Sequence, residues 1–440
     1  MEEVKEEHYI GHLKDINTQQ PVLASEDIYN ENGVLLVAKG TPLSASASQK
    51  LLSHKLAKPL DEVVALEHRL TELKLFHSIQ QCIKQYPDLY YIHQSFQFDG
   101  TLKNLFTTHD LPRTLLQKLT VLQEKFPQVY QCTLFTCWFS SLMVSEMKLP
   151  RQQAESIFLA SLFSDLGLLH IAEELVEKDS FDDAVEQRNY QSHPLIARMI
   201  ADNCSLYSND MLEAIAQHHE RRDGHGYPKK LYGEQLTFEG QLLAMVNHLY
   251  HVRMKVFVKK HHTLMEFAPY LLINLRSFPA ELIRAMHQLL RRSGLPLHHN
   301  IELGQLVSAS QQLTISIKAI RQVQASLVEL AHLLEPLQTI TSAKRLLRSA
   351  LSLNSTIVRS GLTSEDIENW LGGLKESDYQ DSVQDVAELQ HLEYWLYQGI
   401  DRIKQQLSKM SEQDKVNDST KQSLTGLAEQ IQQQLAVIYI

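Results

Sequence analysis

The feature that most constrains the fold is the segment QHHERRDGHGYP. Neighbouring side chains on a helix point about 100° apart, so His218 and His219 flank one metal ion only if it lies between their directions. Gly224 and Gly226 permit unusual backbone angles and Pro228 ends regular structure, so DGHGYP forms a turn. A helix that ends in such a loop places its histidines at the mouth of a cavity.

This string resembles the signature of the HD-GYP family, a subfamily of HD phosphohydrolases that cleave cyclic di-GMP. Its specificity lies in the order: HHE, then Arg221 and Arg222, then DGxGYP. A histidine pair alone carries little weight, because the chain has 21 histidines. The resemblance covers residues 129–295. It implies an all-helical bundle around a two- or three-metal centre, often of iron or manganese.

Two further family motifs are matched at their expected spacing. The family's HD phrase corresponds to ASLFSDLGLLHI, in which Asp165 matches the aspartate. The family's His-Pro step corresponds to His193 and Pro194. The resemblance therefore implies one complete set of metal ligands, with Asp165 as the catalytic bridging carboxylate. These ligands are Asp165, His193, His218 and His219.

Other positions of the family's metal site carry different residues here. Ser164 replaces the histidine of the HD pair, Asn247 replaces the last aspartate, and Cys132 replaces the upstream histidine. One metal therefore loses every ligand except Asp165, whereas the second keeps its set. One carboxylate and three imidazoles suit a divalent transition metal, so we expect one ion per chain, iron or manganese by the resemblance. A partial first site that uses a Cys132 thiolate is a less favoured alternative.

Each of these residues also has a simpler interpretation. Asp165 alone would be a helix cap or an ion-pair partner, and His193 an ordinary first residue of a helix. The histidine pair alone would be buried and hydrogen-bonded. Their joint spacing favours a metal site over separate structural roles. Minor candidates for replacement ligands near the altered positions are His170, His248 and His251.

The positions that meet substrate phosphate in the family are altered too. Leu168 replaces a lysine, and the Arg-Pro-Tyr-Arg phrase corresponds to VFVK, in which Lys259 keeps a cation and Val256 removes an arginine. Arginine binds phosphate through two parallel N–H donors, so a weaker grip on substrate is expected. Arg253, one turn earlier, either compensates or is a solvated helix residue, and the second interpretation is favoured.

The loop of the signature is complete: Asp223, Gly224, Gly226, Tyr227 and Pro228. In the family this loop is associated with contacts to GGDEF-type diguanylate cyclase domains. It is therefore a candidate surface for a signalling partner, and the amphipathic ring of Tyr227 suits an interface. The equal alternative is that the loop serves only the turn of the fold.

The rest of the chain is expected to flank this domain, giving a mainly α protein. Asn32-Gly33 between short apolar runs predicts a hairpin in a small β-containing module at residues 1–65, either an independent domain or a hairpin packed on the next one. Helical spacing begins near Leu60 and predicts a helical connector at 66–128. The domain at 129–295 is followed by a helical region at 296–440, where apolar spacing from Leu313 to Leu334 favours a bundle helix over a coiled coil.

Composition limits the partners and the location. A net charge of -10 without a basic run argues against nucleic acid binding. No apolar run approaches the ~18 residues that span a bilayer. The acidic N-terminus lacks the apolar core of a signal peptide, and four cysteines form no disulfide framework, so we expect a cytoplasmic protein. Either flanking region is compatible with a homodimer.

Two functions of different classes follow from the resemblance. The favoured one is a regulatory module of cyclic di-GMP signalling that binds this or a related nucleotide, or a partner, and hydrolyses it weakly or not at all. The alternative is an active metal-dependent phosphodiesterase that uses the remaining site. A non-catalytic scaffold similar to the HDOD group is a third interpretation, which the complete GYP motif disfavours.

Overall fold

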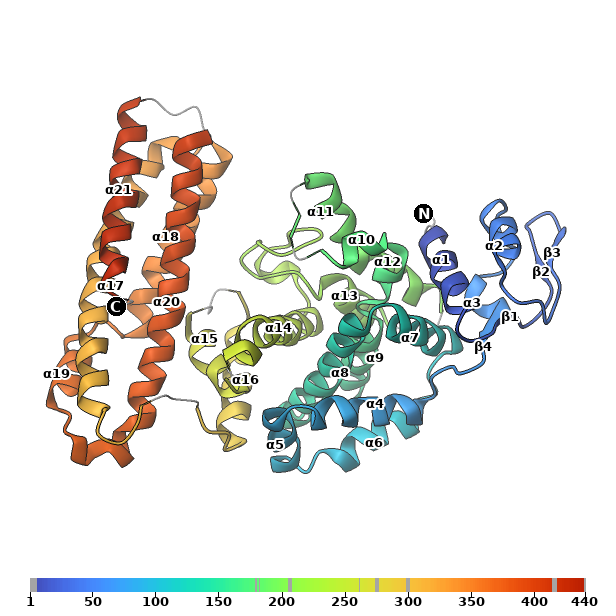
Figure 1. The fold of residues 1–440 in the computed structure, drawn as a ribbon, viewed down its shortest axis with the longest axis horizontal. Helices are drawn as coiled ribbons and strands as arrows, with labels where there is room; N and C mark the ends of the chain where they lie inside the picture. Colours follow the sequence, from blue (N-terminus) through green and yellow to red (C-terminus); the bar gives the residue numbers. More distant parts are fainter. Residues whose placement is uncertain are drawn as a thin grey trace. The chain divides into compact units, whose positions relative to one another are not determined.

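The computed structural model describes residues 6–178, 180–181, 183–204, 208–260, 262–273, 277–297, 301–413 and 418–438. The chain is mainly helical, as predicted, and divides into two compact units (Figure 1). The first unit comprises Met1–Val256 and Arg276–Gly294, and the second comprises Phe257–Leu275 and Leu295–Ile440. These units are coarser than the four predicted segments, whose separate roles stay predictions.

The first unit begins with a small β-containing module, as the sequence predicts. Its elements are α1 (Glu7–Ile16), β1 (Val22–Ala24), β2 (Ile28–Tyr29), β3 (Leu35–Val37), α2 (Ala45–Leu52), α3 (Leu60–Val63) and β4 (Val64–Leu66). The predicted hairpin forms between β2 and β3, and Gly33 turns the chain with a φ of 76°. The helical pattern predicted from Leu60 is wrong for β4, because Val64 and Leu66 are buried in an antiparallel pair with β1.

Helices of residues 72–163 build the core of the first unit. They are α4 (Glu72–Lys84), α5 (Pro87–Ser95), α6 (Asp99–Thr108), α7 (Arg113–Lys125), α8 (Pro127–Met147) and α9 (Arg151–Phe163). The chain from Cys132 to Val144 is buried at every residue, which is typical of a helix surrounded by others. α8 packs against α4, α7 and α9, so it is the central helix of this unit.

The next elements carry the motifs singled out in the sequence. They are η1 (Leu166–His170), α10 (Glu173–Val176), α11 (Ala184–Tyr190), α12 (His193–Asp202), α13 (Asn209–Gln217), η2 (Gly233–Gln235), α14 (Phe238–Val252), the π-helical η3 (Arg253–Phe257) and α16 (Ala280–Arg292). The Ser208 and Thr237 side chains cap α13 and α14 by accepting from backbone N–H groups of the first turn. α13 packs against α9, α12 and α14, which brings the separate motifs together.

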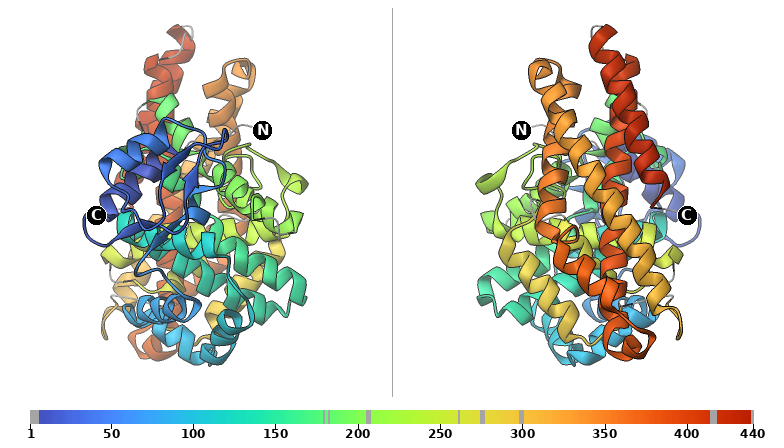
Figure 2. Two further views of the ribbon diagram at one scale, coloured as in Figure 1. Left: turned by 90° about the vertical axis from the view of Figure 1, so that its right-hand side faces the viewer. Right: turned by 90° about the vertical axis from the view of Figure 1, so that its left-hand side faces the viewer.

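The second unit is a bundle of long helices. Its elements are η4 (Val258–Lys260), η5 (Leu264–Glu266), α15 (Phe267–Ile273), α17 (Leu306–Leu334), η6 (Glu335–Leu337), α18 (Thr341–Ser360), α19 (Glu365–Gly373), η7 (Glu376–Asp378), α20 (Tyr379–Gln413) and α21 (Asp418–Ala436). The helices α17, α18, α20 and α21 pack side by side, as the right view of Figure 2 shows in orange and red. The apolar residues of α17 face this core, so the predicted bundle helix is confirmed. Within the described part of the chain, none of the helices combines the length and the hydropathy that crossing a bilayer requires.

Candidate metal centre

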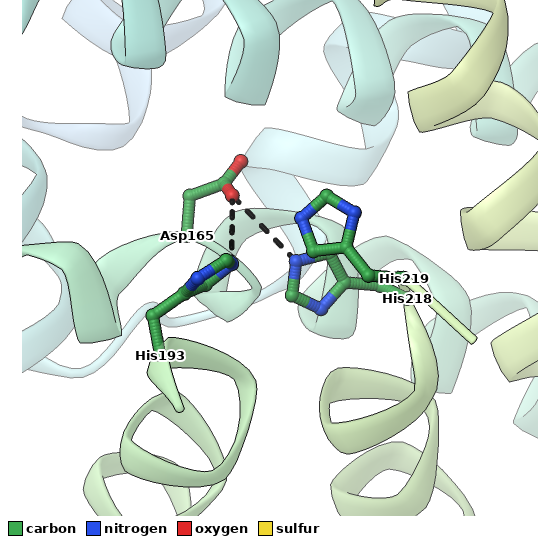
Figure 3. A group of neighbouring side chains, drawn as sticks. All are labelled: Asp165, His193, His218 and His219. Atoms are coloured by element: carbon green, nitrogen blue, oxygen red, sulfur yellow. Dashed lines mark ion pairs between the residues drawn. The ribbon is translucent and has the colours of Figure 1, made fainter. Parts of the chain in front are cut away.

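Four side chains from three separate segments meet at one point of the first unit (Figure 3). Asp165 lies between α9 and η1, and His193 is the first residue of α12. His218 is the C-cap of α13, and His219 follows it. Each residue offers one ligand atom, and these atoms all lie within 4.8 Å of one another. The structure therefore brings together the four predicted ligands.

The orientation of two imidazoles is fixed by the backbone. His193 Nδ1 lies 2.8 Å from the Tyr190 carbonyl oxygen, and His218 Nδ1 lies 2.7 Å from the Ile215 carbonyl oxygen. A carbonyl oxygen only accepts, so each Nδ1 carries the proton and each Nε2 offers a lone pair. A second ring nitrogen held in this way is typical of metal-ligating histidines.

The free nitrogens of these rings point at the carboxylate. His193 Nε2 lies 3.9 Å and His218 Nε2 lies 3.6 Å from Asp165 Oδ1. Both nitrogens are buried without a hydrogen-bond partner. Buried polar atoms are normally paired, so two converging lone pairs beside a carboxylate fit a cation between them. The geometry and chemistry of these donors therefore fit a divalent transition metal.

Burial sets the protonation of the centre. It lowers the pKa of His193 to about 3, and the neighbouring His218 adds to the shift. Burial and the same neighbour hold the pKa of His219 well below its usual range. Burial alone would raise the pKa of Asp165, but the imidazoles of His218 and His193 hold it below its usual value. At neutral pH Asp165 is therefore a carboxylate and His193 and His219 are neutral imidazoles, the forms that bind metal.

The three altered positions hold neutral groups. Asn247 Nδ2 donates to Cys132 Sγ at 3.5 Å, and Ser164 Oγ donates to the Ser161 carbonyl oxygen at 3.2 Å. Burial, and then the charge of Asp165, hold the pKa of the Cys132 thiol well above its usual range. The thiolate that the less favoured first site requires is therefore disfavoured in this environment. Thr133, which no sequence motif marks, has its hydroxyl 3.2 Å from the Val129 carbonyl oxygen and 3.5 Å from Asp165 Oδ2, so its single proton serves one of these two acceptors.

The loop after the histidines is tied back to them. Glu220 is 1% exposed, and its carboxylate accepts from Lys229 N at 2.6 Å and from Leu231 N at 3.0 Å. The Tyr227 backbone N–H donates to the His219 carbonyl oxygen at 3.1 Å. The rings of these two residues stack with centroids 4.6 Å apart. Tyr227 thus supports the candidate centre, whereas the exposed side of the loop carries His225.

The first half of the loop is fixed by an ion pair and a serine hydroxyl that bonds to both of its members. Arg221 donates through one NH2 group to Asp223 Oδ2 and to Ser277 Oγ, at 2.7 Å in each case. The Ser277 hydroxyl in turn donates to Asp223 Oδ2 at 3.0 Å. Asp223 Oδ1 accepts from the backbone of His225 at 3.0 Å, which shapes the turn. Gly226 has to be glycine, because a β-carbon there would lie 2.3 Å from Arg221 N.

Residues considered for substrate contact have different roles. Arg253 is 3% exposed and binds Asp88 through two nitrogens, at 2.7 and 3.3 Å, with Tyr86 under its guanidinium. The favoured interpretation of Arg253 as a solvated helix residue was wrong, because its buried partner Asp88 lies too far away in sequence to be recognised. The alternative, a contact with substrate, stays a prediction. Leu168 is a core residue at 2% exposure. Lys259 is exposed and belongs to the second unit, so its contact with substrate stays a prediction.

The three minor candidate ligands lie outside the group of four donors. His170 Nε2 lies 3.2 Å from Lys118 Nζ, so this ring nitrogen contacts the lysine and not a metal ion at Asp165. The ring of His251 lies 6.4 Å from that of His219, centroid to centroid, and the ring of His248 lies 6.0 Å from that of Phe278. The structure groups none of the three with Asp165.

Comparisons with known proteins concern the region that holds these four donors. Residues 118–272 match the model of the HD domain family. A stretch of 106 residues is 26% identical to a 3′3′-cGAMP-specific phosphodiesterase of Vibrio cholerae and covers 24% of either chain. A stretch of 135 residues is 27% identical to a cyclic di-GMP phosphodiesterase of Pseudomonas aeruginosa, over 30% of this chain and 32% of that protein. The chain thus spans about a quarter to a third of these curated relatives.

A solved structure is also similar to the chain. It is a cyclic GMP-AMP-specific phosphodiesterase of V. cholerae, with a TM-score of 0.30 and 14% identity over 72% of this chain and 96% of that one. The family match begins in α7 and ends in α15. Asp165 and the three histidines all lie inside it.

Proposed function

Because residues 118–272 form a domain of the HD superfamily, we propose that this chain acts in cyclic dinucleotide signalling with a one-metal site. The metal is held by Asp165, His193, His218 and His219. In this proposal the chain binds cyclic di-GMP or a related cyclic dinucleotide, hydrolyses it weakly or not at all, and acts mainly as a regulatory component. The names of the matched relatives, which are cyclic dinucleotide phosphodiesterases, support the substrate class.

One observation carries the metal site: His193 Nε2 and His218 Nε2 are buried, unpartnered and directed at Asp165. A divalent ion held there would polarise a phosphoryl oxygen and acidify a water molecule. The protein contributes the rest. Backbone carbonyls hold two rings in the ligating tautomer, and Tyr227 stacks on the third ring.

The neutral groups beside the centre are the reason to propose that catalysis is weak or absent. A two-metal site clamps both the attacking and the leaving oxygen of a phosphodiester, and the resemblance places the other ion among Cys132, Ser164 and Asn247. Here these positions offer a protonated thiol, a hydroxyl and an amide. Loss of one donor that stabilises developing charge already costs about 100- to 1,000-fold in rate, and loss of an ion should cost at least as much.

An active phosphodiesterase is the second candidate, and the complete four-donor set favours it. A single ion retains part of the chemistry, so the two candidates differ in rate and not in location. Elemental analysis of gently purified protein comes first, and one iron or manganese per chain is the expected result. No bound metal, before or after anaerobic reloading with either ion, would sink both candidates.

Turnover then separates the candidates. The reloaded protein is incubated with cyclic di-GMP and with 3′3′-cGAMP, and linear products are measured against a His218→Ala/His219→Ala control. The regulatory proposal expects nucleotide binding by calorimetry with turnover close to that of the control. Multiple turnovers within minutes, absent from the control, would instead establish the active enzyme.

The loop Asp223–Pro228 is part of the proposal as a surface for a signalling protein such as a GGDEF-type domain. With Tyr227 stacked on His219, the exposed residues that a partner could contact include His225 and, just beyond the loop, Tyr232 at 68% exposure. A His225→Ala/Tyr232→Ala variant should lose partner binding and keep its metal. Unchanged binding of a GGDEF-type protein by this variant would exclude the surface.

A further inference from the structure

A buried charged cluster joins the N-terminal module to η1. Lys118 on α7 is 2% exposed, and its Nζ lies 2.8 Å from Asp61 Oδ2. The same nitrogen lies 3.7 Å from the centroid of the Tyr9 ring and 3.2 Å from His170 Nε2. The Tyr9 hydroxyl donates to Asp61 Oδ1, and the Tyr9 ring stacks on His170 with centroids 5.4 Å apart. We call these four residues the Lys118 cluster.

The Lys118 cluster fixes the orientation of His170. The ammonium has three N–H donors, and a carboxylate, an imidazole and an aromatic face lie around it. Lysine only donates, so His170 Nε2 accepts and the ring carries its proton on Nδ1. All four side chains are at most 5% exposed, which leaves little room for another arrangement.

His170 connects this cluster to the candidate metal centre. It is the last residue of η1, and η1 starts directly after Asp165. The Leu168 N–H donates to the Asp165 carbonyl oxygen at 3.0 Å, and the Ile171 N–H donates to that of Leu168 at 3.1 Å. η1 also packs against α12, where Gly167 touches the backbone of His193. The short helix after Asp165 is therefore held between the ligand helix α12 and the Lys118 cluster.

Stability alone is a weak reason to bury these charges. Apolar residues of similar volume often replace a buried ion pair with no loss of stability, so a role in specifying geometry is the better explanation. We infer that Lys118, Asp61, Tyr9 and His170 are positioning residues for Asp165. They fix η1 and, through it, the distance between the Asp165 carboxylate and His193. The N-terminal module is thereby coupled to the centre.

The test removes the charges while keeping the volume. A Tyr9→Phe/Asp61→Leu/Lys118→Met variant is compared with the wild type by hydrogen–deuterium exchange, in metal-free protein. The amides of Leu168 and Ile171 should exchange at least about tenfold faster, while the melting temperature and the exchange of α8 stay the same. The matched control is Asp88→Leu/Arg253→Met, which removes a different buried ion pair of the first unit and should leave η1 unchanged.

A second readout depends on the proposed metal. The triple variant should bind manganese about 10- to 100-fold more weakly than the wild type, as changes to groups that orient ligands do. A wild-type protein without metal would overturn the proposed function, and the exchange data would still decide the positioning role.

Two results would overturn the inference: unchanged exchange in η1, or uniform acceleration throughout the first unit, which reports lost stability alone. If the triple variant does not fold, His170→Leu serves instead, since it leaves the Lys118–Asp61 pair intact. It should speed exchange in η1 and leave α3 as protected as in the wild type. Unchanged protection of η1 in this variant would also overturn the positioning role.

Discussion

Gly167 packs directly on the backbone of His193: a β-carbon at Gly167 would lie 2.0 Å from the His193 carbonyl oxygen and 2.9 Å from Ala197 N. Backbone atoms cannot move aside as a flexible side chain does. Gly167→Ala should therefore push η1 away from α12, lower the stability by about 1–3 kcal/mol and weaken metal binding. Chemical denaturation and a manganese titration measure the two effects.

The control for this prediction is Gly100→Ala. A β-carbon at Gly100, in α6, meets nothing within 4 Å, so this change should be neutral or stabilise the protein by up to about 1 kcal/mol. If Gly167→Ala bound metal as tightly as Gly100→Ala does, the close contact would have no role in the centre.

The Glu220 carboxylate holds the segment that follows the loop Asp223–Pro228, because it accepts from the backbone N–H groups of Lys229 and Leu231. Glu220→Gln keeps the size but replaces one acceptor oxygen by a donor, which leaves one of the two backbone N–H groups facing another donor. We expect a loss of about 1–3 kcal/mol in the free energy of unfolding and faster proteolysis of the loop. Glu234→Gln, at an exposed position of η2, should change stability by less than about 0.5 kcal/mol. Equal effects of the two changes would contradict the clamp.

The Arg253–Asp88 pair predicts a role in stability and none in substrate binding. Arg253→Met leaves the buried carboxylate of Asp88 unpaired, which typically costs about 3–5 kcal/mol. The double variant Asp88→Leu/Arg253→Met should recover most of this loss, as a double-mutant cycle by denaturation would show. If an Arg253→Met protein were as stable as the wild type but bound nucleotide more weakly, Arg253 would contact the substrate after all.

His12 predicts an acid-sensitive stability. It is 4% exposed with its ring edge against Phe126, and burial, followed by the charge of Lys125, lowers its pKa to about 4. The carboxylate of Glu173, 3.9 Å from Nδ1, opposes this shift only in part. The unfolded chain takes up a proton near pH 6.5 and the folded chain does not, so stability is full above that pH. It falls as the pH drops towards 4, by up to about 1.4 kcal/mol per unit.

Denaturation curves at pH 7.5, 5.5 and 4.5 test this expectation. In His12→Leu the free energy of unfolding should decline less with acidification than in the wild type, so the difference between the two proteins changes with pH in favour of the variant. A parallel decline in both proteins would mean that His12 titrates normally.

The sequence located the donors of the candidate centre because each lies in a short motif of fixed spacing. His218 and His219 are adjacent, and a family phrase surrounds both Asp165 and His193. Two glycines and a proline predicted that a helix ends in the loop DGHGYP, but α13 ends earlier, at Gln217, so the two histidines lie at and just beyond its end and not within it. Motifs whose residues are close together in the chain can therefore be recognised from the sequence alone.

Roles that depend on distant partners were missed. The Arg253–Asp88 pair joins residues 165 positions apart, and Lys118 meets Tyr9, Asp61 and His170 from three other segments. Nothing near Lys118 in the sequence distinguishes it from a solvated lysine. The prediction of helix at β4 failed for the same reason. Helical spacing is a local signal, whereas the pairing of β4 with β1 depends on a distant segment.

The connectivity of the two units has a practical consequence. The chain passes from the first unit to the second after Val256, returns at Arg276, and leaves again after Gly294. No single cleavage point separates them. A protein shortened to end at Gly294 would keep α15 but lose α20, whose Trp395 packs on Tyr270 with ring centroids 4.7 Å apart. Such a fragment would expose apolar surface and aggregate, so the metal centre should be studied in the whole chain or after α15 is redesigned.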